Sequence, residues 1–325
     1  MTTSLSPALD GTLQFFNNRS GQRVAYYKSR GNQGAVIDSH PLVLLHSINA
    51  AASAYEVRPL FEHFAPTRPT FVLEWPGFGQ SERAPADRKP DYDFRLYADT
   101  LQDFLEHLSK NHPPSDVVAM SLSGEHAALV AKERPELFHS LTLLSPTGLT
   151  REPPRTDRFS HFLPRILSGR PWSQPLFSLL SSHASIRYFL GKSFFGPVDA
   201  GLLAYCYETS HQPGADSAPW AFLGGRFAVP EVFQRVYLEV QTPTLVLYDK
   251  DAYTSFDRLG ELLLKNRAFR AMRIPNTRGL PHWDNPKLTC AAITQHLHAT
   301  RRPTSVPDLV PELQQSQRSH PTLLS

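Results

Sequence analysis

Ser121 is the residue best placed for chemistry in this chain. It follows the apolar run 117–120 and precedes a helical pattern, so we expect its hydroxyl on a tight turn between a strand and a helix. Such a turn exposes a nucleophilic hydroxyl and directs the backbone N–H of the next residue at the oxyanion that forms during the reaction. Ala119 and Ser123 flank it at two residues' distance, and their small size permits the turn, although both lack the freedom of glycine at positive φ. The alternative is an ordinary serine at a helix N-cap.

Strands and helices alternate around this serine, which is typical of an α/β fold with a mostly parallel sheet and helices on both faces. Apolar runs of the kind found in strands buried on both faces cover 41–49, 70–75, 117–120, 140–145 and 244–248. Amphipathic segments predict helices over 55–64, 92–107 and 122–133. We also expect an N-terminal antiparallel hairpin over 12–28 that turns near Ser20 and Gly21.

Several motifs together resemble the α/β-hydrolase fold. They are His46-Ser47 after one strand, Glu74-x-x-Gly77-x-Gly79-x-Ser81 after the next, the turn at Ser121, and the later Asp251 and His282. The resemblance covers residues 12–299, and the order Ser, Asp, His is the one that superfamily uses. The chain is most similar to a subgroup that has His-Ser-Ile-Asn in place of His-Gly and a Thr-Ser-His-Gln-Pro-Gly segment in its cap.

The resemblance implies a division of the chain into four parts. Residues 12–148 and 241–299 would form the hydrolase core, 149–240 an inserted helical cap, and 300–325 a disordered tail. Within 159–195 we expect two short amphipathic helices, broken by Pro171 and Pro175.

The resemblance also implies an acid in the loop that follows 244–248. Asp251 is the predicted acid, because the fold directs this loop toward the serine's partner histidine. Asp249 follows the strand so closely that it is better suited to shaping the turn. The alternative for Asp251 is also a turn aspartate.

His282 is the predicted general base, because it is the only histidine in the loop that the fold normally uses. Its spacing departs from the family motif. When Asp284-x-Pro286 is aligned with the family's Glu-x-Pro, Gly279 takes the position of the catalytic histidine. Either the loop is re-spaced, or the base is missing, and the alternative role of His282 is to cap or pack the final helix.

The oxyanion hole would use the N–H groups of Leu122 and Ile48. Ser47, in place of a glycine, narrows the mouth of the site, and Asn49 could add a side-chain donor. The residues predicted to line the site are His46, Ser47, Asn49 and His211. The alternative for this loop is a polar turn in which His46 only braces its neighbours, and His126 is expected to pack.

Composition excludes several classes of protein. The 33 basic and 30 acidic residues are interspersed and give a net charge of +3, which does not indicate nucleic-acid binding. Cys206 and Cys290 lie far apart and do not have metal-like spacing, so we expect reduced thiols in a cytoplasmic protein. The sequence also lacks a signal-peptide pattern, an apolar run of membrane-spanning length and a phosphate-cradling glycine loop. We therefore expect no metal and no cofactor.

Two functions remain. The first is a serine hydrolase that cleaves an ester, thioester or related carbonyl substrate with an apolar group, by a Ser121–His282–Asp251 mechanism. The second is a non-hydrolytic protein of the same fold with a degenerate triad, such as a binding module, a lyase or an isomerase. The expected partner is a small hydrophobic molecule. Contact with a membrane surface is the alternative for the basic, apolar part of the cap, which includes Arg158, Arg165, Arg170, Arg187 and Lys192.

Overall fold

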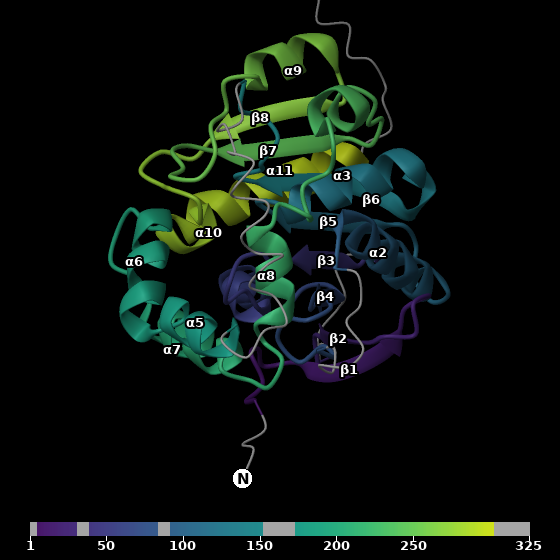
Figure 1. Ribbon diagram of the computed structural model, residues 1–325. Coiled ribbons are helices and arrows are strands. Elements are labelled where there is room, and N and C mark those ends of the chain that lie inside the picture. Colours follow the sequence, from purple (N-terminus) through teal and green to yellow (C-terminus); the bar gives the residue numbers. More distant parts are fainter. Residues whose placement is uncertain (1–4, 31–38, 84–91, 152–172, 302–325) are drawn as a thin grey trace, which may run out of the picture.

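The core is one eight-stranded sheet with the strand order β1-β2-β4-β3-β5-β6-β7-β8 (Figure 1). The computed structural model describes residues 5–30, 39–83, 92–151 and 173–301. The strands are β1 (Thr12–Asn17), β2 (Arg23–Lys28), β3 (Leu42–Leu45), β4 (Thr70–Leu73), β5 (Ser115–Met120), β6 (Phe138–Leu144), β7 (Thr244–Tyr248) and β8 (Phe269–Arg273). The predicted α/β class with a mostly parallel sheet is confirmed.

Strands β3 to β8 run parallel, and β2 is antiparallel both to β1, its partner in the N-terminal hairpin, and to β4. Its turn uses Gly21 at a φ of 76°, a conformation that glycine adopts without steric cost. Because parallel strands end at the same edge of a sheet, the loops after β3, β5, β7 and β8 meet there. This edge carries Ser121, and also the loops that hold the predicted acid and base.

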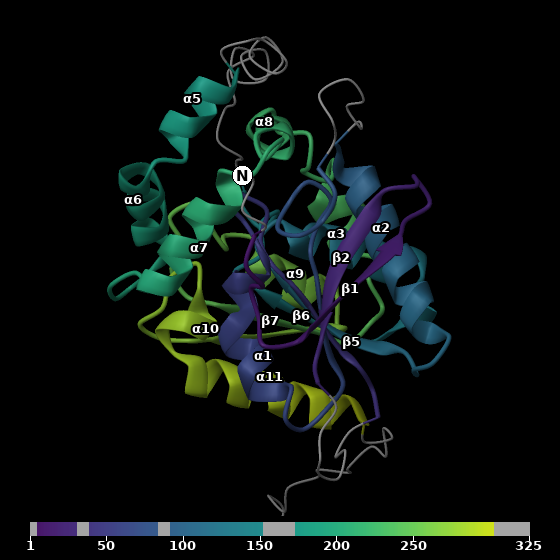
Figure 2. The same cartoon turned by 90° about the horizontal axis from the view of Figure 1, so that it is seen from below.

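Helices cover both faces of the sheet. The helices of the core are α1 (Arg58–Phe64), α2 (Phe94–Ser109), α3 (Ser123–Glu133), α9 (Leu259–Lys265), α10 (Pro281–Asp284) and α11 (Pro286–Arg301). Figure 2 shows α1 and α11 together, on the side of the sheet away from α2 and α3. Two buried apolar clusters fill the two interfaces, one with α2 and α3 and the other with α1 and α11. The helix predicted over 55–64 is divided into a 3₁₀ turn, η1 (Ala54–Val57), and α1.

The described chain between β6 and β7 is helical and contains no strand. We call residues 145–243 the β6–β7 insertion. The elements in its described part are α5 (Ser173–Leu180), α6 (His183–Ser193), α7 (Ala200–Ser210), α8 (Ser217–Leu223) and a π-helical turn, η3 (Phe233–Tyr237). The prediction that Pro175 breaks a helix is wrong: Pro175 lies in the first turn of α5, where its missing N–H is tolerated. Pro171 and the tail from 302 lie outside the described residues.

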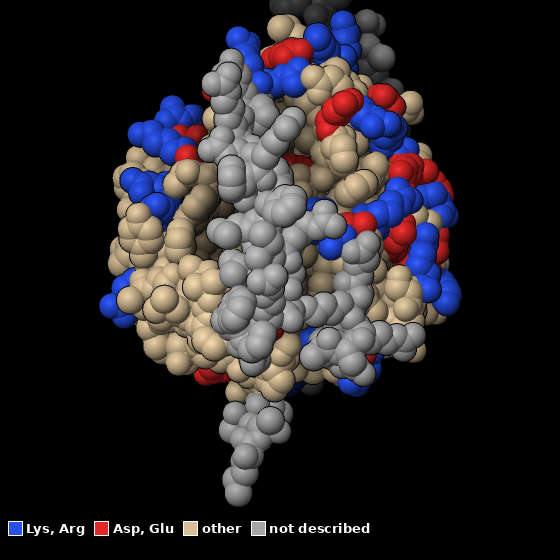
Figure 3. All heavy atoms as spheres, viewed as in Figure 1, with Lys and Arg blue, Asp and Glu red and all other residues tan. Residues whose placement is uncertain are grey.

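The expected membrane-facing part of the insertion is only partly described. Arg158, Arg165 and Arg170 lie outside the described residues. On α6, Tyr188 and Phe189 are exposed, and the Lys192 ammonium lies 4.3 Å from the centroid of the Tyr188 ring. Figure 3 shows uncharged atoms over much of the lower left of the molecule, where α5–α7 lie. Membrane contact stays a prediction, which flotation with anionic vesicles would test.

Two kinds of feature are absent from the described residues. None of the helices there combines the length and the apolar character that crossing a bilayer requires. In the same residues, no three His, Cys, Asp or Glu side chains come together as metal ligands would.

Candidate active site

Ser121 lies between β5 and α3 in a strained conformation. Its φ is 50°, a left-handed value that a non-glycine residue adopts at a cost of about 1–3 kcal/mol. The turn is held from both sides, because the Ser121 N–H donates to the Leu144 carbonyl at 2.9 Å and the Ser121 carbonyl accepts from the Gly124 N–H at 3.0 Å. Such strain persists only where the surroundings impose it, and it tends to be found at functional sites.

Ser123, which replaces a glycine of the usual motif, links the turn to the neighbouring loops. Its hydroxyl donates to the His46 carbonyl at 2.5 Å and accepts from the Trp75 indole N–H at 2.9 Å. The same indole N–H lies 3.1 Å from the His46 carbonyl. The hydroxyl at position 123 therefore binds the loops after β3 and β4 to the start of α3.

His46 braces these loops. Its Nδ1–H donates to the Ser47 carbonyl at 2.7 Å, and its Nε2 accepts from the Trp75 backbone N–H at 3.3 Å. The ring is fully buried, and burial lowers the pKa of His46 to about 4. Both ring nitrogens are thus engaged in holding the loop, which matches the bracing alternative that the sequence left open.

Glu56 holds the predicted oxyanion loop, and the sequence analysis missed it. Its carboxylate accepts from the Ser47 backbone N–H at 2.9 Å and from the Asn49 side-chain amide at 2.8 Å. The Asn49 amide also donates to the Ser47 hydroxyl at 2.8 Å. Asn49 therefore has its donors directed into the loop. Burial raises the pKa of Glu56, and these hydrogen bonds partly oppose that effect.

The predicted oxyanion donors remain available. The N–H groups of Leu122 and Ile48 make no hydrogen bond to the described part of the chain. Both residues are buried close to the end of the sheet that carries Ser121. Their role as an oxyanion hole stays a prediction.

Asp251 and Asp249 have different surroundings in the loop after β7. The Asp249 carboxylate accepts from the Arg273 side chain at 2.5 Å and from the Thr277 N–H at 3.2 Å, so it joins the loops after β7 and β8. Asp251 accepts from the Tyr253 N–H at 2.8 Å through Oδ1. Burial raises the pKa of Asp251 despite such backbone hydrogen bonds.

Gly279 is the residue whose Cα faces Asp251. A β-carbon added to Gly279 would lie 3.0 Å from Asp251 Oδ2 and 3.5 Å from its Cγ. The backbone of Gly279 is not in the left-handed region, so its conformation does not require a glycine. The position beside the acid is thus 279, and it carries no side chain.

His282 is hydrogen-bonded to Glu56, a residue of η1. Its Nε2–H donates to the Glu56 carbonyl at 2.6 Å, and the Trp283 indole N–H donates to the same oxygen at 2.7 Å. The ring is fully buried, its Nδ1 has no hydrogen-bond partner in the described chain, and burial lowers its pKa to about 4. The structure thus joins His282 to neither Ser121 nor Asp251.

The structure places His126 and His211, the other two histidines named above, away from Asp251. His126 is buried, and its Nε2 lies 2.8 Å from the Phe227 carbonyl, so it packs under the insertion as expected. His211 is exposed after α7, where its Nδ1 lies 2.8 Å from the Tyr207 carbonyl and its ring stacks on that tyrosine. Neither contacts Asp251 in the structure.

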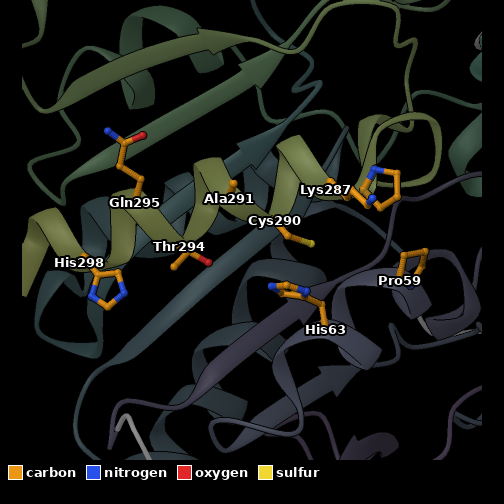
Figure 4. A pocket seen from close by; sticks show the side chains of 9 residues that line it. Pro59, His63, Lys287, Cys290, Ala291, Thr294, Gln295 and His298 are labelled. Atoms are coloured by element: carbon orange, nitrogen blue, oxygen red, sulfur yellow. The ribbon is translucent and has the colours of Figure 1, made fainter.

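A surface hollow of about 530 Å³ lies between α1 and α11 (Figure 4). His63 on α1 and Cys290 on α11 face each other across it. Burial raises the pKa of the Cys290 thiol to about 11, so it is protonated and a weak nucleophile. The lining includes none of the predicted site residues.

Solved structures similar to this one include several hydrolases. A serine hydrolase involved in carbazole degradation shares 18% identity over 89% of this chain and 99% of its own, with a TM-score of 0.67. A putative lipase from Acinetobacter baumannii shares 18% identity over 89% of this chain and 92% of its own, with a TM-score of 0.68. A membrane phospholipase A, described as a bacterial virulence factor, shares 20% identity over 90% of this chain and 87% of its own, with a TM-score of 0.65. At these identities the similarity demonstrates the fold.

No curated protein matches the sequence significantly. The model of the alpha/beta hydrolase family matches residues 42–292, which contain β3 to β8 and the start of α11. This match spans most of the chain and every loop of the candidate site. The chain belongs to the α/β-hydrolase family.

Proposed function

We propose that this protein carries out acyl transfer at Ser121 on an ester, thioester or related carbonyl compound that has an apolar group. The observation that carries the proposal is the φ of 50° at Ser121, held by hydrogen bonds at both its N–H and its carbonyl. A strained serine between a strand and a helix presents its hydroxyl to a ligand at the edge of the sheet. The hydrolases among the solved structures of similar fold support this choice.

In this proposal Ser121 Oγ attacks the carbonyl carbon, and the carbonyl π electrons move to oxygen. The N–H groups of Leu122 and Ile48 stabilise the resulting oxyanion. Collapse of the tetrahedral intermediate releases the alcohol or thiol, and water then attacks the acyl-serine. Asp251 orients the base that accepts the Ser121 proton.

The apolar group of the substrate would contact the β6–β7 insertion. Phe177 of α5 and Trp220 of α8 pack together with Ala50, which follows Asn49 in the predicted oxyanion loop. Aromatic side chains of the insertion thus reach the loop on which the carbonyl oxygen would sit. This arrangement favours an acyl or aromatic group over a charged one.

We do not assign the base to His282. Its Nε2–H is bound to the Glu56 carbonyl, and the depressed pKa reflects a fully buried ring. The Ser121–His282–Asp251 mechanism would require this hydrogen bond to break and α10 to move. Residue 279, which does face Asp251, has no side chain to accept a proton.

Gly279 favours a second candidate function, a non-hydrolytic member of the family. Removal of one triad member lowers the rate by about four to six orders of magnitude. A chain without a base beside Asp251 could bind a carbonyl compound in the same site without turning it over. Binding, lyase or isomerase activity would then be expected, as fold does not fix function.

Intact-mass measurement of covalent adducts would distinguish these functions. The protein, Ser121→Ala and Ser178→Ala, an exposed-serine control on α5, would be incubated with a fluorophosphonate and with p-nitrophenyl esters and acyl thioesters of increasing chain length. Acyl transfer predicts an adduct that only Ser121→Ala abolishes. A ligand-induced rise in melting temperature without any adduct would support the non-hydrolytic function.

A reducing, cytoplasmic location is proposed together with this function. Cys206 and Cys290 are both buried as free thiols. Their state fits a compartment in which disulfides do not form. Fractionation of cells that express the tagged protein would test the location.

A further inference from the structure

We propose that a hollow in the β6–β7 insertion binds a primary ammonium group carried on a short apolar stem. The hollow has a volume of about 270 Å³ and lies between α5 and the turn that joins α7 to α8. The described residues that line it include Phe177, Ser210, His211, Gln212, Ala215 and Asp216. Three of them belong to the Thr-Ser-His-Gln-Pro-Gly segment of the sequence. The inference goes beyond the proposed function, because it stands whether or not Ser121 transfers acyl groups.

The polar side chains of this segment direct hydrogen-bond donors toward the end of α7. The Ser210 hydroxyl and the His211 Nδ1–H both donate to the Tyr207 carbonyl, at 3.0 Å and 2.8 Å. The Gln212 side-chain amide donates to the Glu208 carbonyl at 3.1 Å. Carbonyls in the last turn of a helix have no partner within the helix, so these side chains satisfy them.

These hydrogen bonds leave acceptor atoms for a ligand. When Nδ1 carries the proton of a neutral His211, Nε2 is an acceptor. Gln212 keeps its Oε1, and the Ser210 oxygen keeps a lone pair. The ligand that suits such a lining is one that brings donors, and an ammonium group brings three of them.

The charge around the hollow favours a cation. None of the described residues that line it is a lysine or an arginine, and Asp216 adds a carboxylate. The C-terminal end of a helix carries a partial negative charge, and the hollow lies at that end of α7. This end of α7 already binds one cation of the chain, because the Arg83 side chain donates to the Thr209 carbonyl at 3.3 Å.

Phe177 and Ala215 give the hollow an apolar wall. Both side chains are buried, and they pack with Trp220 and Ala50. The volume of about 270 Å³ lies just below the range of about 300–1,000 Å³ that is usual for pockets of drug-sized ligands. The stem that carries the ammonium group is therefore short, such as one ring or a few carbons.

Titration with benzylamine at pH 8, where its amine is protonated and histidine is neutral, tests the proposal. Binding would be followed by the ¹H–¹⁵N signals of the four tryptophan indoles, and Trp220→Phe would identify the signal of the ring that packs on Phe177 and Ala215. We expect that signal to shift saturably, with a dissociation constant on the order of 1 mM for so small a ligand. Benzyl alcohol should bind at least about fivefold more weakly, and benzoate should leave the signal unchanged.

Three variants locate the binding. Asp216→Asn keeps the shape of the hollow and should weaken benzylamine binding about fivefold, whereas Ala215→Leu fills the hollow and should abolish the shift. The matched control, Glu208→Gln, removes an acid of α7 that does not line the hollow and should change the dissociation constant by less than about twofold. Melting temperatures report whether each variant is folded. The inference is wrong if benzylamine causes no shift, if benzyl alcohol binds equally well, or if folded Asp216→Asn and Ala215→Leu both bind as the unmodified protein does.

Discussion

The two ends of β5 show two ways in which a sheet uses polar residues. At its start, the Asp116 carboxylate accepts from the Arg68 side chain at 2.6 Å, from the Ser140 hydroxyl at 2.5 Å and from His139 Nδ1 at 2.8 Å. These partners hold the pKa of Asp116 well below its usual range. At its end, Ser121 has a strained backbone and a hydroxyl for which the structure records no protein partner in the described chain.

This difference separates stability from reactivity. Every partner of Asp116 is supplied by the protein, so that end of β5 is complete without a ligand. At the other end, the predicted acid lies beside a glycine and the predicted oxyanion N–H groups have no described partner. Hydrogen-bonding groups that have no partner within the described chain are the ones to which a ligand can bind.

The largest effect is expected from removing the acid at the start of β5. Asp116→Ala leaves the buried Arg68 without that carboxylate, and loss of one member of a buried pair costs about 3–5 kcal/mol. Urea unfolding would measure this loss. Ser140→Ala, the matched control, should cost about 1 kcal/mol. Slower labelling of Ser121 in folded Asp116→Ala would show that the two ends of β5 are coupled and would contradict the separation of stability from reactivity.

The next effect concerns the loop that lies beside Ser121. Glu56→Ala removes the acceptor of the buried Ser47 N–H and should lower the unfolding free energy by about 2 kcal/mol. It should also slow labelling of Ser121, because the loop with the Ile48 N–H is released. Glu62→Ala, which removes an exposed acid on α1, is the control and should change neither measurement.

The comparison also predicts a pH dependence. His46, His126 and His282 are neutral in the fold down to a pKa of about 4, but the unfolded chain protonates them near pH 6.5. Their stabilisation is present above pH 6.5 and is lost as the pH falls toward 4, by about 1.4 kcal/mol per pH unit for each ring.

The Asp116 contribution behaves differently, because the pKa of this carboxyl is depressed in the fold: its stabilisation is present above the unfolded value of about 3.9 and is lost only as the pH falls below that value. Urea unfolding at pH 5 to 7 would measure the slope. His126→Gln should reduce the average slope over this range by about 1 kcal/mol per pH unit, because the unfolded imidazole is already mostly neutral between pH 6.5 and 7. An unchanged slope would mean that this histidine is not held neutral.

The smallest effect should come from relieving the strain at Ser121. Ser121→Gly should raise the unfolding free energy by about 1 kcal/mol, because the relief of about 1–3 kcal/mol exceeds the added flexibility of the unfolded chain. Ser121→Ala keeps the strain and should leave stability almost unchanged. A destabilised Ser121→Gly would show that the turn is not under strain. Thermal unfolding would distinguish these outcomes.

Much of the fold could be predicted from the sequence, because its signals are local. The apolar runs at 70–75 and 244–248 are strands β4 and β7, and the small residues around Ser121 correctly indicated the turn after β5. Pro175 was misinterpreted because a proline in the first turn of a helix has the same local sequence signal as one that breaks it.

The candidate site was harder to predict because its contacts join distant segments. The Glu56 carbonyl accepts from His282, which lies 226 residues later, and no periodicity or spacing encodes that hydrogen bond. The alignment of the closing motif did contain the relevant signal, since it placed Gly279 where a histidine was expected. Only the structure shows that residue 279 faces Asp251 while His282 faces η1.

The β6–β7 insertion has a consequence for the variation that this fold can accept. The strands on either side of it pair directly, with Leu141 opposite Thr244, although residues 145–243 intervene. The entropy of closing a loop grows only with the logarithm of its length, by about 0.6 kcal/mol for each doubling. The insertion can therefore be lengthened, shortened or exchanged with little penalty to the sheet, while the register of β6 and β7 stays the same.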